Sequence, residues 1–289
     1  DTMTTEHEPF EKPIEPKVKY TDVNDISDDE LITKWLIDGW IEEQSLVCIY
    51  GERNISKSYV ALTWAYLLAQ GKAIHNCKVK NKAKTLLIYT EGRNTLKPRL
   101  KALEIQYGAI DYRQLIRYDE EWSFDDNKVD DLIDYFKKHF DLIIIDSYSA
   151  SLDDESVNSD AVTRSKLKKI KKIRDECEAT VILIAHSGKN PTKGIMGSSV
   201  LGNDIDTEIR VSGKKKPIIT LTKQRNGTKE SMVMPFIPLP HIIGEDEKGK
   251  PVFNLALIFG SNDFDEFDKQ ILEAFKECSD NGLLEEVEK

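Results

Sequence analysis

The sequence contains no long run of apolar residues. None approaches the roughly 20 consecutive apolar residues that a membrane-spanning helix needs, so no membrane partner is expected. Residues 1–20 are polar and charged, and we therefore expect no secretory signal peptide there.

Cysteine is scarce in this chain of 289 residues. The four cysteines, Cys48, Cys77, Cys177 and Cys278, are far apart, and their spacing fits no zinc site. We expect free thiols in a reducing cytoplasm, that of a bacterium, an archaeon or a phage-infected cell.

Basic residues are outnumbered by acidic ones. The chain has 41 Lys and Arg against 51 Asp and Glu, a net charge of −10. This balance argues against a protein whose whole surface is coated with nucleic acid, because phosphate binding needs positive potential. A local basic lining in particular loops remains compatible with it.

The length suits one large α/β domain with short appendages. We predict a flexible arm or linker at residues 1–30, the main domain at 31–261, and a helical segment at 262–289 that could be a truncated small module. The first of these is rich in Glu, Lys, Pro and Asp and has few large apolar residues, which is typical of disordered segments.

Strand and helix patterns alternate through the main domain. Apolar runs predict strands at 45–50, 85–90, 115–118, 142–146 and 180–185. Helical patterns predict helices at 57–70, 95–107, 127–140 and 161–178. Such alternation predicts a mostly parallel sheet flanked by helices on both faces.

The later part of the domain has a different pattern. Short runs at 207–212, 218–222 and 231–236 are separated by turn signals and predict an antiparallel β extension of the sheet. Residues 237–261 are loop-rich and receive no assignment. Before the first strand, residues 36–41 predict a short helix or turn at the edge of the core.

The strongest motif, Gly51-Glu-Arg-Asn-Ile-Ser-Lys57-Ser58, lies between the first strand and the first helix. A P-loop reads G-x-x-x-x-G-K-[ST] in this context, and its backbone N–H groups cradle nucleotide phosphates. Lys57 is expected to reach the β- and γ-phosphates and Ser58 to bind Mg²⁺, so we predict ATP and Mg²⁺ as cofactors. The predicted nucleotide-binding residues are Gly51, Glu52, Arg53, Asn54, Ile55, Ser56, Lys57, Ser58 and Tyr59.

Ser56 stands where the second glycine of this motif belongs. If the position needs a positive φ, a serine there costs of order 1 kcal/mol. A chance or decayed motif is the alternative, and a P-loop with weaker affinity or slower turnover is a third reading. The strand, Gly51, Lys57, Ser58 and the helix are all in place, which favours a P-loop.

Polar residues also follow three other predicted strands. Asp146 ends an apolar strand about ninety residues after the P-loop and is predicted to hold Mg²⁺ together with Ser58. Glu91 follows the strand after the first helix, where a carboxylate can activate the attacking water as a general base. His186 ends a further strand, at the sheet edge where α/β proteins bind ligands, and can sense the γ-phosphate. The plain alternatives are a strand-end cap, an exposed turn residue and a structural histidine.

Lys223 and Arg225 precede the Asn226-Gly227 turn. Two cations at a hairpin tip can reach the γ-phosphate of a neighbouring subunit and stabilise charge in the transition state, as an arginine finger does. The alternative is a solvated basic turn.

In this order the motifs resemble the RepA-like branch of the RecA-fold ATPases, the hexameric replicative helicases of plasmids and the related ATPase modules of phage and mobile-element replication proteins. The resemblance covers residues 36–227 and extends to Trp35-Leu-Ile-Asp-Gly39, Gly71-Lys72 and the Gly-Ser-Ser at 197–199. It implies a RecA-like P-loop core and a homo-hexamer. The catalytic residues it implies are Glu91 as base, Lys57, His186 as sensor, and Lys223 and Arg225 acting in trans.

The same resemblance implies that single-stranded DNA is bound by two loops, 147–160 and 187–204. The first carries Asp153-Asp154-Glu155, which would repel phosphate, whereas the second carries Lys189 and Lys193 and suits contact with a nucleic-acid backbone.

Two further features bear on DNA binding. Tyr148 is the only aromatic residue of the two loops that could stack on bases. The basic run 166–174 has apolar residues at helical spacing, which favours a solvated helix face over a nucleic-acid patch.

Three functions fit these observations. The leading one is a DNA-dependent motor, either a hexameric replicative helicase or the helicase part of a primase–helicase. The second is an accessory ATPase of recombination or annealing, with the same fold. The third is a nucleotide-gated binding scaffold with weak turnover.

Overall fold

A computed structural model of the chain describes residues 32–79, 82–152, 155–188, 194–197, 199–214, 216–227 and 232–260, with Asp25 and Ser27. By their internal contacts the residues form two units, 1–33 and 34–289. The helix predicted after residue 262, and most of the arm predicted at 1–30, lie outside the described residues.

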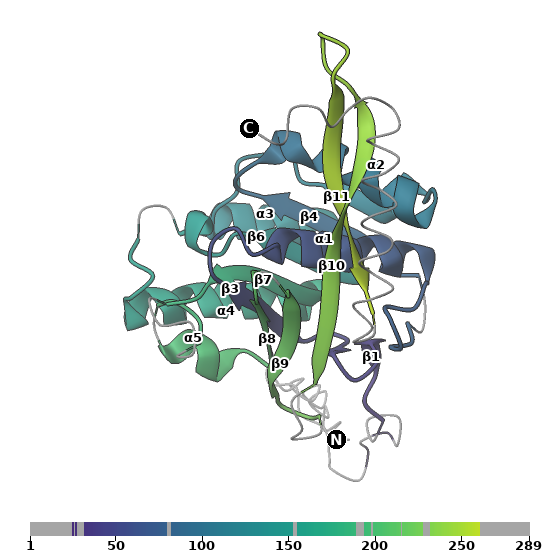
Figure 1. Cartoon of the computed structure of the whole chain (residues 1–289). Coiled ribbons are helices and arrows are strands. Elements are labelled where there is room, and N and C mark those ends of the chain that lie inside the picture. Colours follow the sequence, from purple (N-terminus) through teal and green to yellow (C-terminus); the bar gives the residue numbers. More distant parts are fainter. Residues whose placement is uncertain are drawn as a thin grey trace, which may run out of the picture. The chain divides into compact units, whose positions relative to one another are not determined.

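The second unit is built on a nine-stranded sheet with the order β11-β10-β9-β8-β3-β7-β6-β4-β5 (Figure 1). The strands from β8 to β5 are parallel, and β9, β10 and β11 each run antiparallel to the strand before them. This confirms the α/β class with a mostly parallel sheet and an antiparallel extension. The strands are β3 (Leu46–Gly51), β4 (Thr85–Tyr89), β5 (Leu115–Arg117), β6 (Leu142–Asp146), β7 (Thr180–His186), β8 (Thr207–Ser212), β9 (Ile218–Gln224), β10 (Val233–Glu245) and β11 (Pro251–Phe259).

Helices cover both faces of the sheet and form two hydrophobic cores. Val47 and Ile49 of β3 face one core, while Cys48 and Tyr50 face the other, as expected for a strand whose successive side chains alternate. The first core contains α1 (Lys57–Gln70) and α2 (Leu96–Tyr107). The second contains α3 (Asp126–Phe136), α4 (Asp160–Cys177) and α5 (Ser199–Asp204).

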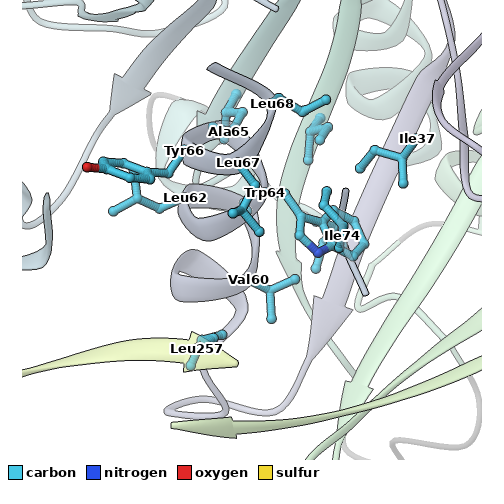
Figure 2. Packing of buried hydrophobic residues seen from close by; sticks show 14 of the residues in the cluster. Ile37, Val60, Leu62, Trp64, Ala65, Tyr66, Leu67, Leu68, Ile74 and Leu257 are labelled. Atoms are coloured by element: carbon cyan, nitrogen blue, oxygen red, sulfur yellow. The ribbon is translucent and has the colours of Figure 1, made fainter. Parts of the chain in front are cut away.

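Helix α1 is apolar on nearly all sides, which is typical of a helix buried in the interior. Figure 2 shows Trp64 directed toward Ile37 and Ile74, with Leu62 and Tyr66 on the other side. The Trp64 ring lies 6.1 Å from that of Phe259 in β11. The helix that follows the P-loop is therefore packed by the last strand as well as by the sheet.

The β10–β11 hairpin reaches over both helices of the first core (Figure 1). The hydroxyl of Tyr107, at the end of α2, donates to the carbonyl of Leu257 in β11. The hydroxyl of Tyr59, in the first turn of α1, donates to Asn254 Oδ1 at 2.9 Å. These contacts attach the hairpin to the end of α2 and to the beginning of α1, next to the P-loop.

Two segments had been left open by the sequence. Of the short helix or turn predicted at residues 36–41, the turn is confirmed: β1 (Trp35–Ile37) and β2 (Ile41–Glu42) make a short hairpin around it, and Gly39 in the turn has a φ of 72°. Residues 237–261 are largely strand. Pro238 and Pro240 obscured that pattern, but they lie where β10 has already left β9 and pairs with β11, and an edge position tolerates proline.

Two further properties of the described residues concern helices and thiols. In the described part of the chain, no helix has the length and apolar character needed to span a bilayer. Cys48 and Cys177 are buried and Cys77 is partly buried, all three as free thiols, and Cys278 lies outside the described residues.

Candidate nucleotide site

The parallel strands deliver the predicted site residues to one edge of the sheet. Gly51, at the end of β3, is in register with His186 at the end of β7. Asp146, at the end of β6, is in register with Tyr89 of β4, and Glu91 follows two residues later as an exposed side chain. The carboxyl ends of the central strands thus bring together residues from four separate parts of the sequence, at the edge where open α/β sheets bind ligands.

The P-loop turns sharply between β3 and α1. Asn54 and Ser56 both have left-handed backbone conformations, with φ of 59° and 65°. Gly51 has no room for a side chain, because a Cβ there would lie 2.4 Å from the carbonyl oxygen of Val211. Ser56 directly precedes α1, and its side chain makes no capping hydrogen bond to the helix. The side chain of Ser56 therefore leaves the amide groups of the first turn of α1 available to an anion.

Lys57 is buried beneath this loop, with 6% of its surface exposed. Its Nζ donates to the carbonyls of Gly51 at 3.1 Å and Glu52 at 2.5 Å, and it lies 3.4 Å from His186 Nδ1. Burial lowers the pKa of Lys57 to about 8, with the Asp146 carboxylate opposing the shift and Arg53 adding to it. The ammonium is thus held inside the loop by main-chain oxygens.

Ser58 and Asp146 are hydrogen-bonded to each other. Burial raises the pKa of the Asp146 carboxyl, while the Ser58 hydrogen bond and the charges of Arg99 and Lys57 oppose the rise. A hydroxyl beside a buried carboxyl is a donor set that suits Mg²⁺, which prefers oxygen ligands and keeps several waters. Within the described ranges no group of three or more His, Cys, Asp or Glu could hold a metal ion by itself. An ion held by Ser58 and Asp146 would complete its coordination with water or phosphate oxygens.

His186 is half-buried next to this pair. Burial lowers its pKa, the positive charges of Lys57 and Arg53 lower it further, and Glu91 opposes them. The imidazole is therefore mainly neutral at pH 7 and can donate its one N–H to a phosphate oxygen.

Arg99 is a residue of this site that the sequence did not reveal. It lies in α2, with its guanidinium 4.6 Å from the ring centroid of Tyr59 and a hydrogen bond to the Tyr89 side chain. Its charge also acts on Asp146. No motif marks it; the only signal is its place one turn into the helix that follows Glu91.

The two loops predicted to bind DNA begin at Asp146 and His186 and touch each other. Met196 N donates to the His186 carbonyl at 2.7 Å, so the second loop returns to the strand it left. A Cβ on Gly197 would lie 2.5 Å from the Val157 carbonyl oxygen, which shows how closely that segment packs on the first loop. Lys189, Lys193, Asp153 and Asp154 lie outside the described residues.

Two expectations about these surfaces change. Tyr148 is buried with its ring 6.0 Å from that of Phe124, so it is not exposed for stacking on bases. The basic run in α4 is paired with carboxylates instead of being simply solvated, because the helix lies beside acidic segments. The pairs are Lys166–Glu155, Lys169–Asp126, Lys171–Asp204, Lys172–Asp130 and Arg174–Asp206.

Lys223 and Arg225 lie at the other edge of the sheet, away from the P-loop of their own chain. Gln224 is in register with Thr207, which in turn is in register with Val47 near the start of β3. The P-loop begins at the far end of β3, roughly 13–17 Å away at about 3.3 Å per residue.

The two cations have different surroundings. Lys223 is in β9, not at a hairpin tip, and its Nζ donates to the carbonyls of Gly202, Asn203 and Ile205 at the end of α5. Arg225 pairs with Asp206 at 2.9 Å and is about half exposed. A role of either residue in trans remains a prediction.

Comparisons with known proteins give one family match. Residues 12–192 match the protein-family model described as an AAA domain. Among solved structures, the crystal structure of the RadB recombinase is similar, with 17% sequence identity and a TM-score of 0.48 over 67% of this chain and 87% of that chain. A search of curated proteins gave no match.

Proposed function

The chain belongs to the AAA-domain family of P-loop ATPases, and on this basis we propose that it hydrolyses ATP with Mg²⁺ as a DNA-dependent motor. The proposed motor is a hexameric replicative helicase or the helicase part of a primase–helicase. One observation carries the proposal: Lys57, Ser58 and Asp146 meet at the carboxyl edge of the sheet, beside the N-terminus of α1.

The proposed chemistry assigns one task to each residue. The P-loop amides and Lys57 bind the phosphates, and Ser58 and Asp146 hold Mg²⁺. Bound Mg²⁺ neutralises charge that develops on the transferred phosphoryl group. Glu91 accepts the proton of the attacking water, and its exposed position leaves room for that water. His186, 3.4 Å from Lys57, responds to the γ-phosphate through a neutral imidazole.

The motor part of the proposal rests on how the two loops are attached. One begins directly after Asp146, and the other is closed by a hydrogen bond to the His186 carbonyl. The close packing of Gly197 on Val157 links them, so a change at the γ-phosphate reaches both. In this proposal the two loops, 147–160 and 187–204, contact single-stranded DNA through its backbone, since Tyr148 is buried.

Ser56 supports a second candidate, the nucleotide-gated scaffold. A serine with a φ of 65° is strained where the motif has glycine, and such a loop suits a protein that binds ATP and turns it over slowly. The two candidates differ in rate and in the response of that rate to DNA.

The test measures phosphate release with and without single-stranded DNA. We expect stimulation by DNA in the unaltered protein, loss of activity in Lys57→Ala, and no change in the control Lys101→Ala, whose side chain is a surface partner of Glu104. Slow hydrolysis that DNA does not alter would contradict the motor and favour the scaffold. Stimulated hydrolysis without unwinding of a forked duplex would favour an accessory ATPase of recombination or annealing.

A homo-oligomer with shared sites is part of the proposal. Arg225 lies too far along the sheet to serve its own P-loop, so it would act on the nucleotide of a neighbour. Mixing inactive Lys57→Ala with inactive Arg225→Ala subunits should restore hydrolysis, because some interfaces then combine an intact P-loop with an intact arginine. Negative-stain microscopy with ATP and Mg²⁺ should show rings, and mixtures that restore nothing would refute the trans arrangement.

A further inference from the structure

Asp206 joins four segments of the chain at the edge of the sheet opposite the P-loop: its own α5–β8 link, β3, helix α4 and the end of β9. It lies between α5 and β8, and its backbone N donates to the Leu46 carbonyl at 2.9 Å. Its carboxylate accepts a hydrogen bond from Leu46 N at 2.9 Å and pairs with Arg174 of α4 at 3.4 Å. The same carboxylate pairs with Arg225 at 2.9 Å, and its carbonyl accepts from Arg225 N at 3.0 Å.

The two carboxylate oxygens of Asp206 have different partners. Oδ2 accepts the hydrogen bond from Leu46 N and pairs with Arg174, whereas Oδ1 pairs with Arg225. The Asp206 side chain is 13% exposed, and Arg225 is 54% exposed. One oxygen is thus fixed from inside the molecule by β3 and α4, and the other orients an exposed guanidinium.

We propose that Asp206 is the positioning residue for Arg225: it holds the guanidinium at the edge of the sheet, ready for the nucleotide of a neighbouring copy, and connects it to the first residue of the strand that ends in the P-loop. The inference rests on the proposed trans role of Arg225. Leu46 begins β3 and Gly51 ends it, so the nucleotide sites on the two sides of one subunit are linked through a single strand.

Loss of the contact between Asp206 and Arg225 should lower kcat and leave the binding of ATP unchanged. An exposed arginine without a fixed partner samples many rotamers, and a misplacement of about 1 Å at a reacting group can cost about 100-fold in rate. We expect Asp206→Asn to lower kcat about 10- to 100-fold and to leave the KM for ATP within about twofold, because the P-loop is intact. The matched control is Asp175→Asn, which removes a surface carboxylate that also pairs with Arg174, at 2.7 Å. Its kcat should stay within about twofold of the unaltered protein.

Mixed oligomers separate positioning of Arg225 from support of the subunit's own P-loop. If Asp206 acts through Arg225, Asp206→Asn subunits keep a working P-loop. Mixing them with Lys57→Ala subunits should then restore hydrolysis, and mixing them with Arg225→Ala subunits should restore none. The opposite pattern would mean that Asp206 acts through β3 on its own nucleotide, and would overturn the inference.

Two further outcomes have a defined meaning. If Lys57→Ala and Arg225→Ala fail to complement each other, the trans site itself is wrong and the inference falls with it. If they complement but Asp206→Asn behaves like Asp175→Asn, the trans site stands and only the inference is wrong.

A second variant covers the case in which Asp206→Asn does not fold. Asp206→Glu keeps the charge but moves it by one methylene. It should lower kcat and retain cooperative thermal unfolding. In mixtures it should restore hydrolysis with Lys57→Ala subunits but not with Arg225→Ala subunits. Complementation of Arg225→Ala by Asp206→Glu would overturn the inference in the same way.

Discussion

Replacing Ser56 by glycine tests how the P-loop accommodates an unusual residue. Ser56 has a φ of 65° and a ψ of 18°, a left-handed conformation that costs a residue with a Cβ about 1–2 kcal/mol. Glycine removes that cost. It also makes the unfolded chain more flexible, which lowers the free energy of unfolding by about 0.4–1 kcal/mol and offsets part of the gain. The net effect of Ser56→Gly should be a stabilisation of about 0.5–1 kcal/mol.

For a domain of this size the stabilisation should raise the melting temperature by about 1–4 °C. Ser56 has a positive φ in the loop, but the phosphate contacts expected of a P-loop come from backbone amides and from Lys57, and Ser56→Gly removes none of these groups. The affinity for ATP should therefore change by less than about twofold. This expectation narrows the sequence-based view, in which the serine could weaken binding as well as turnover.

The assay is thermal unfolding without nucleotide, followed by titration with a fluorescent ATP analogue. Ser56→Ala is the matched control, because alanine keeps the Cβ and should gain no stability. The reasoning would be refuted by a Ser56→Gly protein that melts no higher than the unaltered one, by equal stabilisation in Ser56→Ala, or by a tenfold gain in ATP affinity.

Four other predictions concern the same site. Gly51→Ala should destabilise the fold by about 1–3 kcal/mol in urea unfolding, because the added Cβ would meet the Val211 carbonyl and force the backbone to move; unchanged stability would contradict this. ATP affinity should fall as the pH rises from 7 to 9.5, since Lys57 loses its charge near pH 8 while the γ-phosphate stays ionised, and Lys57→Arg should show a flatter profile by the same titration. Without nucleotide, the contribution of Lys57 to the free energy of unfolding should rise as the pH increases from about 8 to 10.5, because the unfolded chain binds more protons than the folded one in this range. Glu91→Gln should bind ATP normally but lower kcat about 100-fold or more in phosphate release, and near-normal turnover would exclude it as the base.

Much of the parallel core could be predicted from the sequence, because its elements have strong local signals. The helix at 57–70 and the strand at 142–146 have the predicted bounds, since a P-loop and an apolar run ending in Asp146 mark them. The meeting of Gly51, His186 and Asp146 also follows from the parallel arrangement, which places the ends of these strands at one edge.

The features that the sequence did not reveal depend on contacts between distant segments. Arg99 looks like any helix arginine until α2 places it over Tyr59. Tyr148 looked available to bases, but its ring belongs to the second core. The lysines of α4 were read as solvated because their carboxylate partners come from other elements, such as Asp126 and Asp204.

The strand pairing of residues 237–259 was missed for a different reason. The prolines of β10 break the alternation that marks a strand, and only its pairing with β11 shows that those positions lie on an edge. Lys223 was likewise placed at a turn, whereas β9 extends to Gln224 and directs its ammonium to the end of α5.

The packing of α1 against β11 affects the order in which the chain can fold during synthesis. Trp64 and Phe259 lie in contact although nearly 200 residues separate them in the sequence. At about 5–20 residues per second, a ribosome needs roughly 10–40 s to bridge that separation. Until Phe259 has left the exit tunnel, Trp64 lacks one of its partners and the hairpin cannot hold the first turn of α1 through Tyr59. The P-loop and α1 are thus synthesised early, but α1 reaches its final packing only after β11, the last strand of the sheet, has been made.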